Sequence, residues 1–346
     1  MIKETTHRQQ PNRERAQQQV DVMDSLTTTV RTDYWVVDEH GRLADPDRVA
    51  GLPGADRTDS PYSVAVETPP CETCGELRRA LVDRLRSTVA AAHDRNCRLV
   101  ALGMRPDLLV DEPSPSAAGE PPPIATAGTR VVFEPPAAAA ADCYNTLSAL
   151  DPAFVLINTA SRVDGDQHYA CGRPSLIHGG PAGRYRIADE AATDDRSAAD
   201  DEPTAGGADD DRQPVAWLDG GSKIEWRSLD ATTPTLLVDM VADVTEVLQQ
   251  AVRCRLRIAS FGNGFHGDRL VLPTNEWRAI YTDAAIQKGV SSLLVRAYLE
   301  RFGIETGWYR AAIQPVDAPV PAAELPALCR ERAAGLEADL GLPAVA

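Results

Sequence analysis

Short runs rich in β-branched and aromatic residues alternate with longer stretches of helical spacing, and this order constrains the fold most. The runs predict strands, and the apolar residues at helical spacing predict helices. The helices fall at irregular intervals and no glycine-rich turn joins a strand to a helix, which favours an α+β fold over a doubly wound one. The predicted strands are 30–38, 63–67, 98–103, 130–134 and 223–227, and four of the predicted helices are 137–150, 235–257, 283–302 and 322–338.

A further helix is predicted to begin after Thr73. The threonine side chain can accept from the backbone of Glu76, and a glutamate three residues after a threonine is a capping-box pattern. Four apolar residues then recur at helical spacing and predict one buried stripe: Leu77, Leu81, Leu85 and Val89.

The charge of the chain is strongly acidic, with 51 Asp and Glu against 35 Lys and Arg and a formal net charge of −16. Only three of the basic residues are lysines: Lys3, Lys223 and Lys288. An acidic, lysine-poor surface suits a cytoplasm at molar salt, where self-repulsion is screened. A genome rich in G and C is the alternative reason for so few lysines. Either way, an acidic surface argues against general binding to nucleic acid or to anionic membranes.

Two polar segments frame one predicted domain over 26–340. Residues 1–25 lack apolar periodicity and predict a disordered tail, and the run of Asp, Glu, Ala and Gly at 188–213 predicts a disordered, solvated acidic insertion. Pro and Gly mark 112–123 as a long loop. No run of 18 apolar residues and no signal-peptide core is present, so we expect a cytoplasmic protein.

The seven cysteines are odd in number and scattered, which favours reduced thiols over a disulfide framework. Cys71 and Cys74 have the spacing of metal ligands, but no second close pair and no histidine pair follows them. They are expected to be ordinary residues leading into a helix, with redox or metal chemistry as the alternative.

Five segments in order resemble the glutamate-cysteine ligase family of carboxylate-amine ligases: TVRTDYWVVDEHGRL from Thr29, VAVETPPCETCGELR from Val64, ALDPAFVLINTASRVDG with CGRPSL over 149–176, KIEWRSLDA from Lys223 and TNEWRA from Thr274. The resemblance implies a glutamine-synthetase-like fold, in which helices pack on one face of an antiparallel sheet. It also implies ATP and Mg²⁺ as cofactors and glutamate and cysteine as substrates. In such enzymes the γ-carboxylate of glutamate becomes an acyl phosphate that the amine of cysteine attacks.

The resemblance assigns roles to seven residues of this sequence. Carboxylates on one sheet face would hold Mg²⁺ against the triphosphate, and arginines would neutralise the phosphoryl group or bind the substrate carboxylate. Residues i and i+2 of a strand share a face, which suits this arrangement. The metal ligands would be Asp33, Glu67 and Glu225, the catalytic clamps Arg173 and Arg227, and the cofactor-binding residues Asn275 and Arg278.

Three positions depart from the family pattern. Arg31 stands where the family has the first glutamate of its Gly-Val-Glu-x-Glu strand, and Arg130 and Val132 stand where it has a pair of histidines. An arginine cannot ligate magnesium. Two functions therefore stay open: an ATP-dependent carboxylate-amine ligase, or a catalytically impaired paralogue that acts as a binding or regulatory protein, with a second copy or an active paralogue as its partner.

Simpler structural roles are also open for several of these residues. Asp33 could pair with Arg31, and Glu225 with Arg227, as ordinary sheet-surface pairs. Asn275 and Arg278 could cap or tether their helix, and Trp277 is expected to pack rather than to stack on adenine. The histidines at 168, 178 and 266 are expected to be solvated or locally hydrogen-bonded, and the glycines at 262 and 264 to end a helix.

Overall fold

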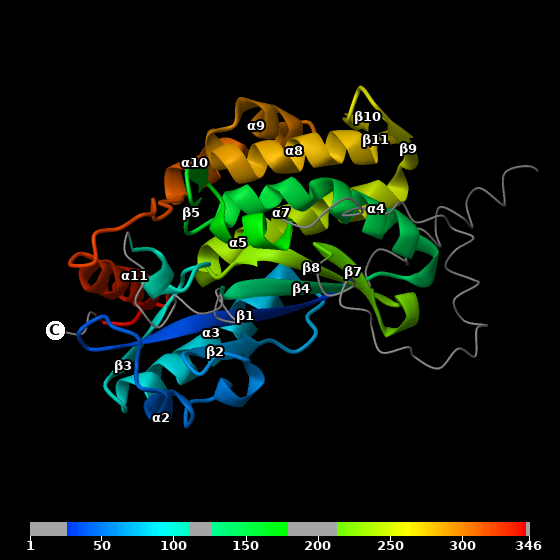
Figure 1. Ribbon diagram of the computed structural model, residues 1–346. Helices are drawn as coiled ribbons and strands as arrows, with labels where there is room; N and C mark the ends of the chain where they lie inside the picture. The colour runs from blue at the N-terminus through cyan, green and yellow to red at the C-terminus, as the bar shows by residue number, and fades with distance from the viewer. Residues whose placement is uncertain (1–25, 111–125, 179–212, 344–346) are drawn as a thin grey trace, which may run out of the picture.

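The computed structural model describes residues 26–110, 126–178 and 213–343. The predicted tail, the loop at 112–123 and all but the last residue of the predicted acidic insertion lie outside these ranges. A central six-stranded sheet has the order β2-β1-β4-β8-β7, and β3 also pairs with β1. Every pairing in this sheet is antiparallel (Figure 1). Its strands are β1 (Thr27–Asp38), β2 (Ser63–Glu67), β3 (Cys97–Val100), β4 (Gly128–Glu134), β7 (Val215–Leu218) and β8 (Lys223–Asp230).

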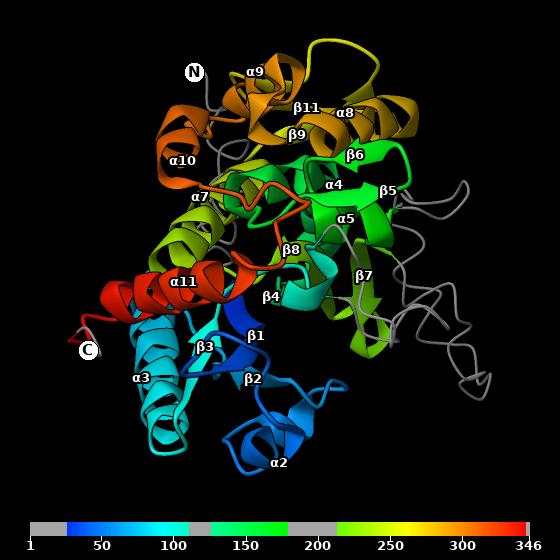
Figure 2. The ribbon, with the colours of Figure 1, turned by 60° about the vertical axis from the view of Figure 1, so that its left-hand side comes forward.

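Most of the helices lie on one face of this sheet in two layers, with α8 and α9 outside α4 and α7 (Figures 1 and 2). The helices are α2 (Pro46–Val49), α3 (Cys74–His93), α4 (Ala140–Leu150), α5 (Gly172–Ile177), α7 (Pro234–Arg253), α8 (Asn275–Lys288), α9 (Leu293–Glu300), α10 (Thr306–Ala312) and α11 (Leu325–Asp339). Single-turn segments include η2 (Ala55–Arg57), η3 (Pro106–Leu108), η5 (Ala137–Ala139), η9 (Asp219–Gly221) and η10 (Gly289–Ser291), and η6 (Asp151–Ile157) is longer. The predicted α+β class is therefore confirmed.

Two small sheets lie outside the central one. One contains β9 (Arg255–Ala259), β10 (Gly264–His266) and β11 (Arg269–Pro273). The other is the hairpin of β5 (Arg162–Asp164) and β6 (Gln167–Tyr169). None of the helices in the described ranges is both long and apolar enough to span a bilayer.

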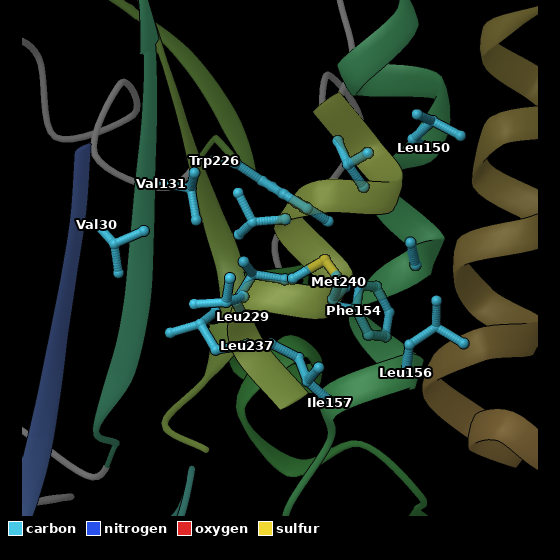
Figure 3. Close-up of a cluster of buried hydrophobic side chains, with 14 of the residues drawn as sticks. Val30, Val131, Leu150, Phe154, Leu156, Ile157, Trp226, Leu229, Leu237 and Met240 are labelled. Carbon is cyan, nitrogen blue, oxygen red and sulfur yellow. The ribbon is translucent and has the colours of Figure 1, made fainter. Parts of the chain in front are cut away.

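The main core lies between the sheet and the inner helices. Val30, Val131 and Trp226 point from three neighbouring strands toward Met240 of α7 and Phe154 of η6 (Figure 3). A second, smaller apolar cluster lies on the opposite face at the β3 end of the sheet, where α11 packs. Alternate residues of β1 therefore divide between two environments, because a strand directs successive side chains to opposite faces.

Several predicted elements are confirmed with small changes in their bounds. The strand at 63–67 has the predicted bounds, and β1 begins three residues earlier than expected. The cap of α3 is confirmed, since the backbone of Glu76 donates to Thr73 Oγ1 at 3.2 Å. The Glu76 carboxylate accepts from the backbone of Glu72 instead of Thr73, at 3.0 Å. All four residues of the predicted apolar stripe are buried.

Two predicted helices are present, but their predicted bounds were wrong. The helix expected over 235–257 ends at Arg253, and the next residues alternate Arg with Leu and Ile in β9, a period of two that favours a strand. The glycines at 262 and 264 therefore follow a strand and lie in the turn before β10 and at its first residue. The helix expected over 283–302 breaks at Gly289, whose φ of 55° is strained for other residues, and restarts after Ser292, which caps α9.

Candidate functional site

The open face of β1 carries a cation and a carboxylate side by side. Arg31 and Asp33 point away from the core residues Val30 and Tyr34, and Arg31 Nε lies 3.8 Å from Asp33 Oδ1. Both side chains are about a quarter to a third exposed, at 31% and 25%. The expectation that they share a sheet face is confirmed. Burial raises the pKa of Asp33, and the charges of Arg31, Arg173 and Arg130 oppose that rise.

The strand register separates the three predicted metal ligands. Glu67 lies beside Arg31, whereas Asp33 lies two residues further along β1. Glu225 pairs with Val132, which pairs with Thr29. Its backbone therefore lies two strands and four residues from that of Asp33, about 16 Å away at ordinary strand spacings. Among the described residues, no group of three His, Cys, Asp or Glu side chains could hold a metal ion.

Each of these carboxylates is instead next to an arginine. Glu67 Oε2 accepts from Nη1 of Arg57 at 3.1 Å, and Glu225 forms a short ion pair with Nε of Arg227. Arg31, beside Asp33, also donates to the backbone carbonyl of Arg57. The residues that the resemblance assigns to Mg²⁺ do not fit that ion here, because each one already faces a cation.

An arginine row crosses the open face, and we define it as Arg31, Arg130 and Arg227. Arg31 on β1 is the direct cross-strand partner of Arg130 on β4. A bulge in β8 places Arg227 and Ser228 beside Arg130, because the register shifts between Thr129 and Val131. Arg130 is exposed and has no hydrogen bond or ion pair within the described part of the chain. Like charges directly opposite in a sheet are destabilising, so this row favours an anionic ligand.

Arg173, the predicted clamp, is a half-buried residue of α5. Its guanidinium lies flat against Gly128, since a Cβ on that glycine would be 2.0 Å from Arg173 Cζ. It donates to Thr126 Oγ1 at 3.0 Å and to the carbonyl of Arg227 at 2.8 Å. Burial lowers the pKa of Arg173, and the charges of Asp230 and Asp33 oppose that change. This residue therefore fastens α5 to the sheet at the end of the arginine row.

Asp230, at the end of β8, is the most perturbed carboxylate of this region. Its Oδ2 accepts from the backbone N–H and the hydroxyl of Thr159, at 2.7 and 2.9 Å. A Cβ on Gly103 would lie 2.2 Å from its Cγ, so only glycine leaves room for it. Burial raises the pKa of Asp230 to about 6, although the contacts with Thr159 and the charge of Arg173 oppose the rise.

The two predicted cofactor-binding residues lie elsewhere, on α8 in the outer helix layer (Figure 1). Asn275 is the exposed first residue of the helix. Arg278 is fully buried and donates from Nε to the carbonyl of Pro273 at 3.1 Å. The inner helices separate both residues from the arginine row. Trp277 packs edge-on against Phe261, with ring centroids 5.9 Å apart, as a packing residue would.

The histidine predictions had mixed outcomes. His266 Nε2 lies 2.7 Å from the carbonyl of Gly262, a local contact as expected. The expectation for His178 was wrong: it is fully buried, with Nε2 3.1 Å from Asp151 Oδ2. Asp151 also accepts from Nε1 of Trp226 at 2.7 Å. Burial raises the pKa of Asp151. The contacts with His178 and Trp226 outweigh burial and hold that pKa below its usual range. No spacing in the sequence indicates this cluster, because its members lie far apart along the chain.

Cys71 and Cys74 lead into α3, as expected. Cys71 is buried and lies with Sγ 3.2 Å from the carbonyl of Pro69, and Cys74 is the half-buried first residue of the helix. Burial raises the pKa of both thiols.

No family model matches the chain, and no curated protein matches it. Three solved structures show a low likeness. A bifunctional glutathione synthetase from Pasteurella multocida has 11% identity and a TM-score of 0.46, covering 94% of this chain and 51% of that chain. The complex of Pup with its ligase PafA has 14% identity and a TM-score of 0.41, covering 92% and 65%. A glutamate-cysteine ligase from Francisella tularensis in complex with AMP has 11% identity and a TM-score of 0.34, covering 93% and 95%.

The chain therefore spans about half of the glutathione synthetase structure. Because all three TM-scores lie below 0.5, nothing about the activity of this chain follows from these likenesses.

Proposed function

We propose that this chain is a catalytically impaired carboxylate-amine ligase relative that binds a small anion, a carboxylate or a phosphate, on its arginine row. The observation that carries the proposal is the cross-strand pair of Arg31 and Arg130, at positions where the resembled family has a metal-site glutamate and a histidine. A guanidinium offers a planar fork of donors that matches carboxylate and phosphate oxygens. A guanidinium group therefore supplies positive charge at this position without a metal ion.

The arginines of the open face support this proposal. The face brings together Arg31, Arg57, Arg130, Arg173 and Arg227 against three carboxylates, Asp33, Glu67 and Glu225, in a chain whose net charge is −16. Four of these arginines have a carboxylate or carbonyl partner, and the exposed Arg130 has none within the described ranges. An anion between Arg31 and Arg130 would reduce the repulsion between them.

A second candidate function is the ATP-dependent ligase that the resemblance implies, joining glutamate to cysteine or another amine. It is favoured by one observation: Asp33, Glu67 and Glu225 share a sheet face with Arg227. Within this candidate, Arg227 would bind the substrate carboxylate or phosphate. A cytoplasmic location, a homo-oligomer and an active paralogue as partner stay proposals under both functions.

The two functions predict different ligands and differ in whether ATP is hydrolysed. Purified full-length protein would be titrated calorimetrically, in KCl high enough to keep it folded, with inorganic phosphate, with glutamate and with Mg-ATP. We expect phosphate or glutamate to bind without Mg²⁺, and ADP release from Mg-ATP with glutamate and cysteine to stay at background. Arg130→Gln should weaken anion binding, whereas Arg310→Gln removes an equal charge from an exposed position on α10 and should not. Tight Mg-ATP binding with substrate-dependent ADP release would establish the second candidate instead.

A further inference from the structure

A separate cavity of about 240 Å³ lies away from the arginine row. Its wall combines the end of η6, strand β6, the junction of α8 with η10, and the segment 315–317 that follows α10. This last segment crosses beside β5 and α5 (Figure 2), and Val316 bridges to Ala160 in parallel register. No residue of the arginine row lines the cavity.

One side of the cavity is rich in hydrogen-bond acceptors. Asp317 Oδ1 lies 2.9 Å from His168 Nε2 and accepts from Ser161 Oγ at 3.3 Å. The Asp317 side chain is 86% exposed, so it can still receive a ligand. Asn158 is only 4% exposed, and its Nδ2 donates to the carbonyl of Ala170 at 2.9 Å. Asn158 Oδ1 then has no hydrogen-bond partner in the described part of the chain.

The cation in this wall is Lys288, the last residue of α8. It is exposed and forms no ion pair with any described residue. The chain has 35 basic residues and only three of them are lysines, so an ammonium group in this wall is unusual. The remaining wall includes Val155, Val290 and Pro315, which are apolar.

We propose that this cavity binds a small α-amino acid with a short aliphatic side chain. The carboxylate of the ligand would pair with Lys288, and its ammonium group would donate to Asp317. The apolar wall would cover the aliphatic side chain. An engineered cavity of about 150 Å³ holds benzene, so a cavity of about 240 Å³ has room for a ligand of the size of valine.

The class of ligand follows from the pairing of opposite charges. A simple carboxylate would pair with Lys288 but lie beside the anionic Asp317, and a simple amine would pair with Asp317 but lie beside the cationic Lys288. Like charges held close together repel, which costs binding free energy. A zwitterion satisfies both sides of the cavity at once.

The test compares L-valine with propionate, which lacks the amine, and with isobutylamine, which lacks the carboxylate. Isothermal calorimetry on the full chain should detect L-valine, with both analogues weaker by about tenfold or more. Lys288→Gln and Asp317→Asn should each weaken L-valine binding by about tenfold, and Lys288→Arg should recover most of the loss. Arg310→Gln is the matched control for the lost positive charge, and thermal melts would verify that every variant is folded.

Three outcomes would overturn the proposal: no binding of L-valine or L-alanine to the folded chain, propionate binding as tightly as L-valine, or variants that bind like the original chain. Arg31→Gln should leave L-valine binding unchanged. The cavity proposal and the arginine-row proposal can therefore fail independently.

Discussion

Arg31 on β1 lies directly opposite Arg130 on β4 in the antiparallel register. Two guanidinium groups at this spacing repel each other, and only Arg31 has a carboxylate partner within the described ranges, namely Asp33. Under the proposed function, this pair stands in place of the metal-site glutamate and the histidine that the resemblance implies, and it would select an anion in place of a cation.

Restoring the family residues at three positions should produce cation binding. In the triple variant Arg31→Glu, Arg130→His and Val132→His, the new glutamate would lie beside Glu67 and share a face with Asp33. We expect Mg²⁺ or Mn²⁺ to raise the melting temperature, because a ligand at a hundred times its Kd stabilises by about 2.7 kcal/mol. The matched control carries Arg31→Gln in place of Arg31→Glu and should show no shift. A folded triple variant that ignores both cations would indicate that more of the site has changed than these three residues.

Filling the space beneath the Arg173 guanidinium should destabilise the chain. Gly128→Ala places a Cβ about where Arg173 Cζ lies, and we expect a loss of about 1–3 kcal/mol in the free energy of unfolding. Gly335→Ala is the matched control on α11: its Cβ meets nothing within 4 Å, and the change should be neutral or stabilising by up to about 1 kcal/mol. Denaturant titrations would measure both. The cost of Gly128→Ala should shrink in an Arg173→Ala background, and an unchanged cost would refute the clash.

The raised pKa of Asp230 predicts a pH dependence of stability. The folded state binds the proton of the Asp230 carboxyl more tightly than the unfolded state does. The contribution of Asp230 to the free energy of unfolding is therefore fully present below pH 3.8, the unfolded pKa, and is lost as the pH rises through about 6. A pKa difference of one between the folded and unfolded states corresponds to about 1.4 kcal/mol, so the loss amounts to about 3 kcal/mol. Asp230→Asn should remove this decrease in the free energy of unfolding with rising pH. The measurement is the difference in unfolding free energy between the original chain and the variant from pH 4 to pH 7, and a constant difference would contradict the assignment.

The buried Glu337 should be the most sensitive residue of α11. Arg98 donates to both its oxygens at 2.8 and 2.6 Å, and His93 Nε2 lies 3.0 Å from Oε1, so the carboxylate joins β3 and α3 to α11. Burial raises the pKa of Glu337, but the bonds from Arg98 and His93 outweigh it and hold that pKa below its usual range.

Glu337→Gln leaves Arg98 without its anion, and we expect a loss of about 3–5 kcal/mol in unfolding free energy. Glu331→Gln, at an exposed position of the same helix, should change it by less than about 0.5 kcal/mol. Chemical denaturation of both variants would measure these values. Equal effects of the two substitutions would show that the Glu337 contacts contribute little.

Local patterns predicted much of the fold. The cap at Thr73, the apolar stripe of α3 and the strand at 63–67 depend on neighbours within a few residues, which the sequence displays directly. The end of α7 was missed because Val252, Leu256 and the arginines between them suit a helix or a strand, and the pairing of β9 with β11 selects the strand. Helix breaks such as Gly289 depend on a backbone angle that apolar spacing does not reveal.

Strand alternation predicted which side chains of one strand share a face, and the rest of the site was not predicted. That rule correctly placed Arg31 with Asp33 and Glu225 with Arg227. It could not show that Arg31 meets Arg130, because cross-strand register depends on contacts about a hundred residues apart, nor that α8 keeps Asn275 and Arg278 away from the sheet. The position of Arg173 likewise depends on Gly128, a residue of β4 that lies far from it in the sequence.

Side-chain contacts hold the short helix α5 at both of its ends. Arg173 near its start lies over Gly128 of the sheet, and His178, which directly follows the helix, lies against the buried Asp151, which also accepts from Trp226. A rocking motion of α5 would have to break both contacts, so the donors at this end of the arginine row are held in place before any ligand arrives. Such preorganisation lowers the entropy lost on binding and favours selection by geometry over adaptation.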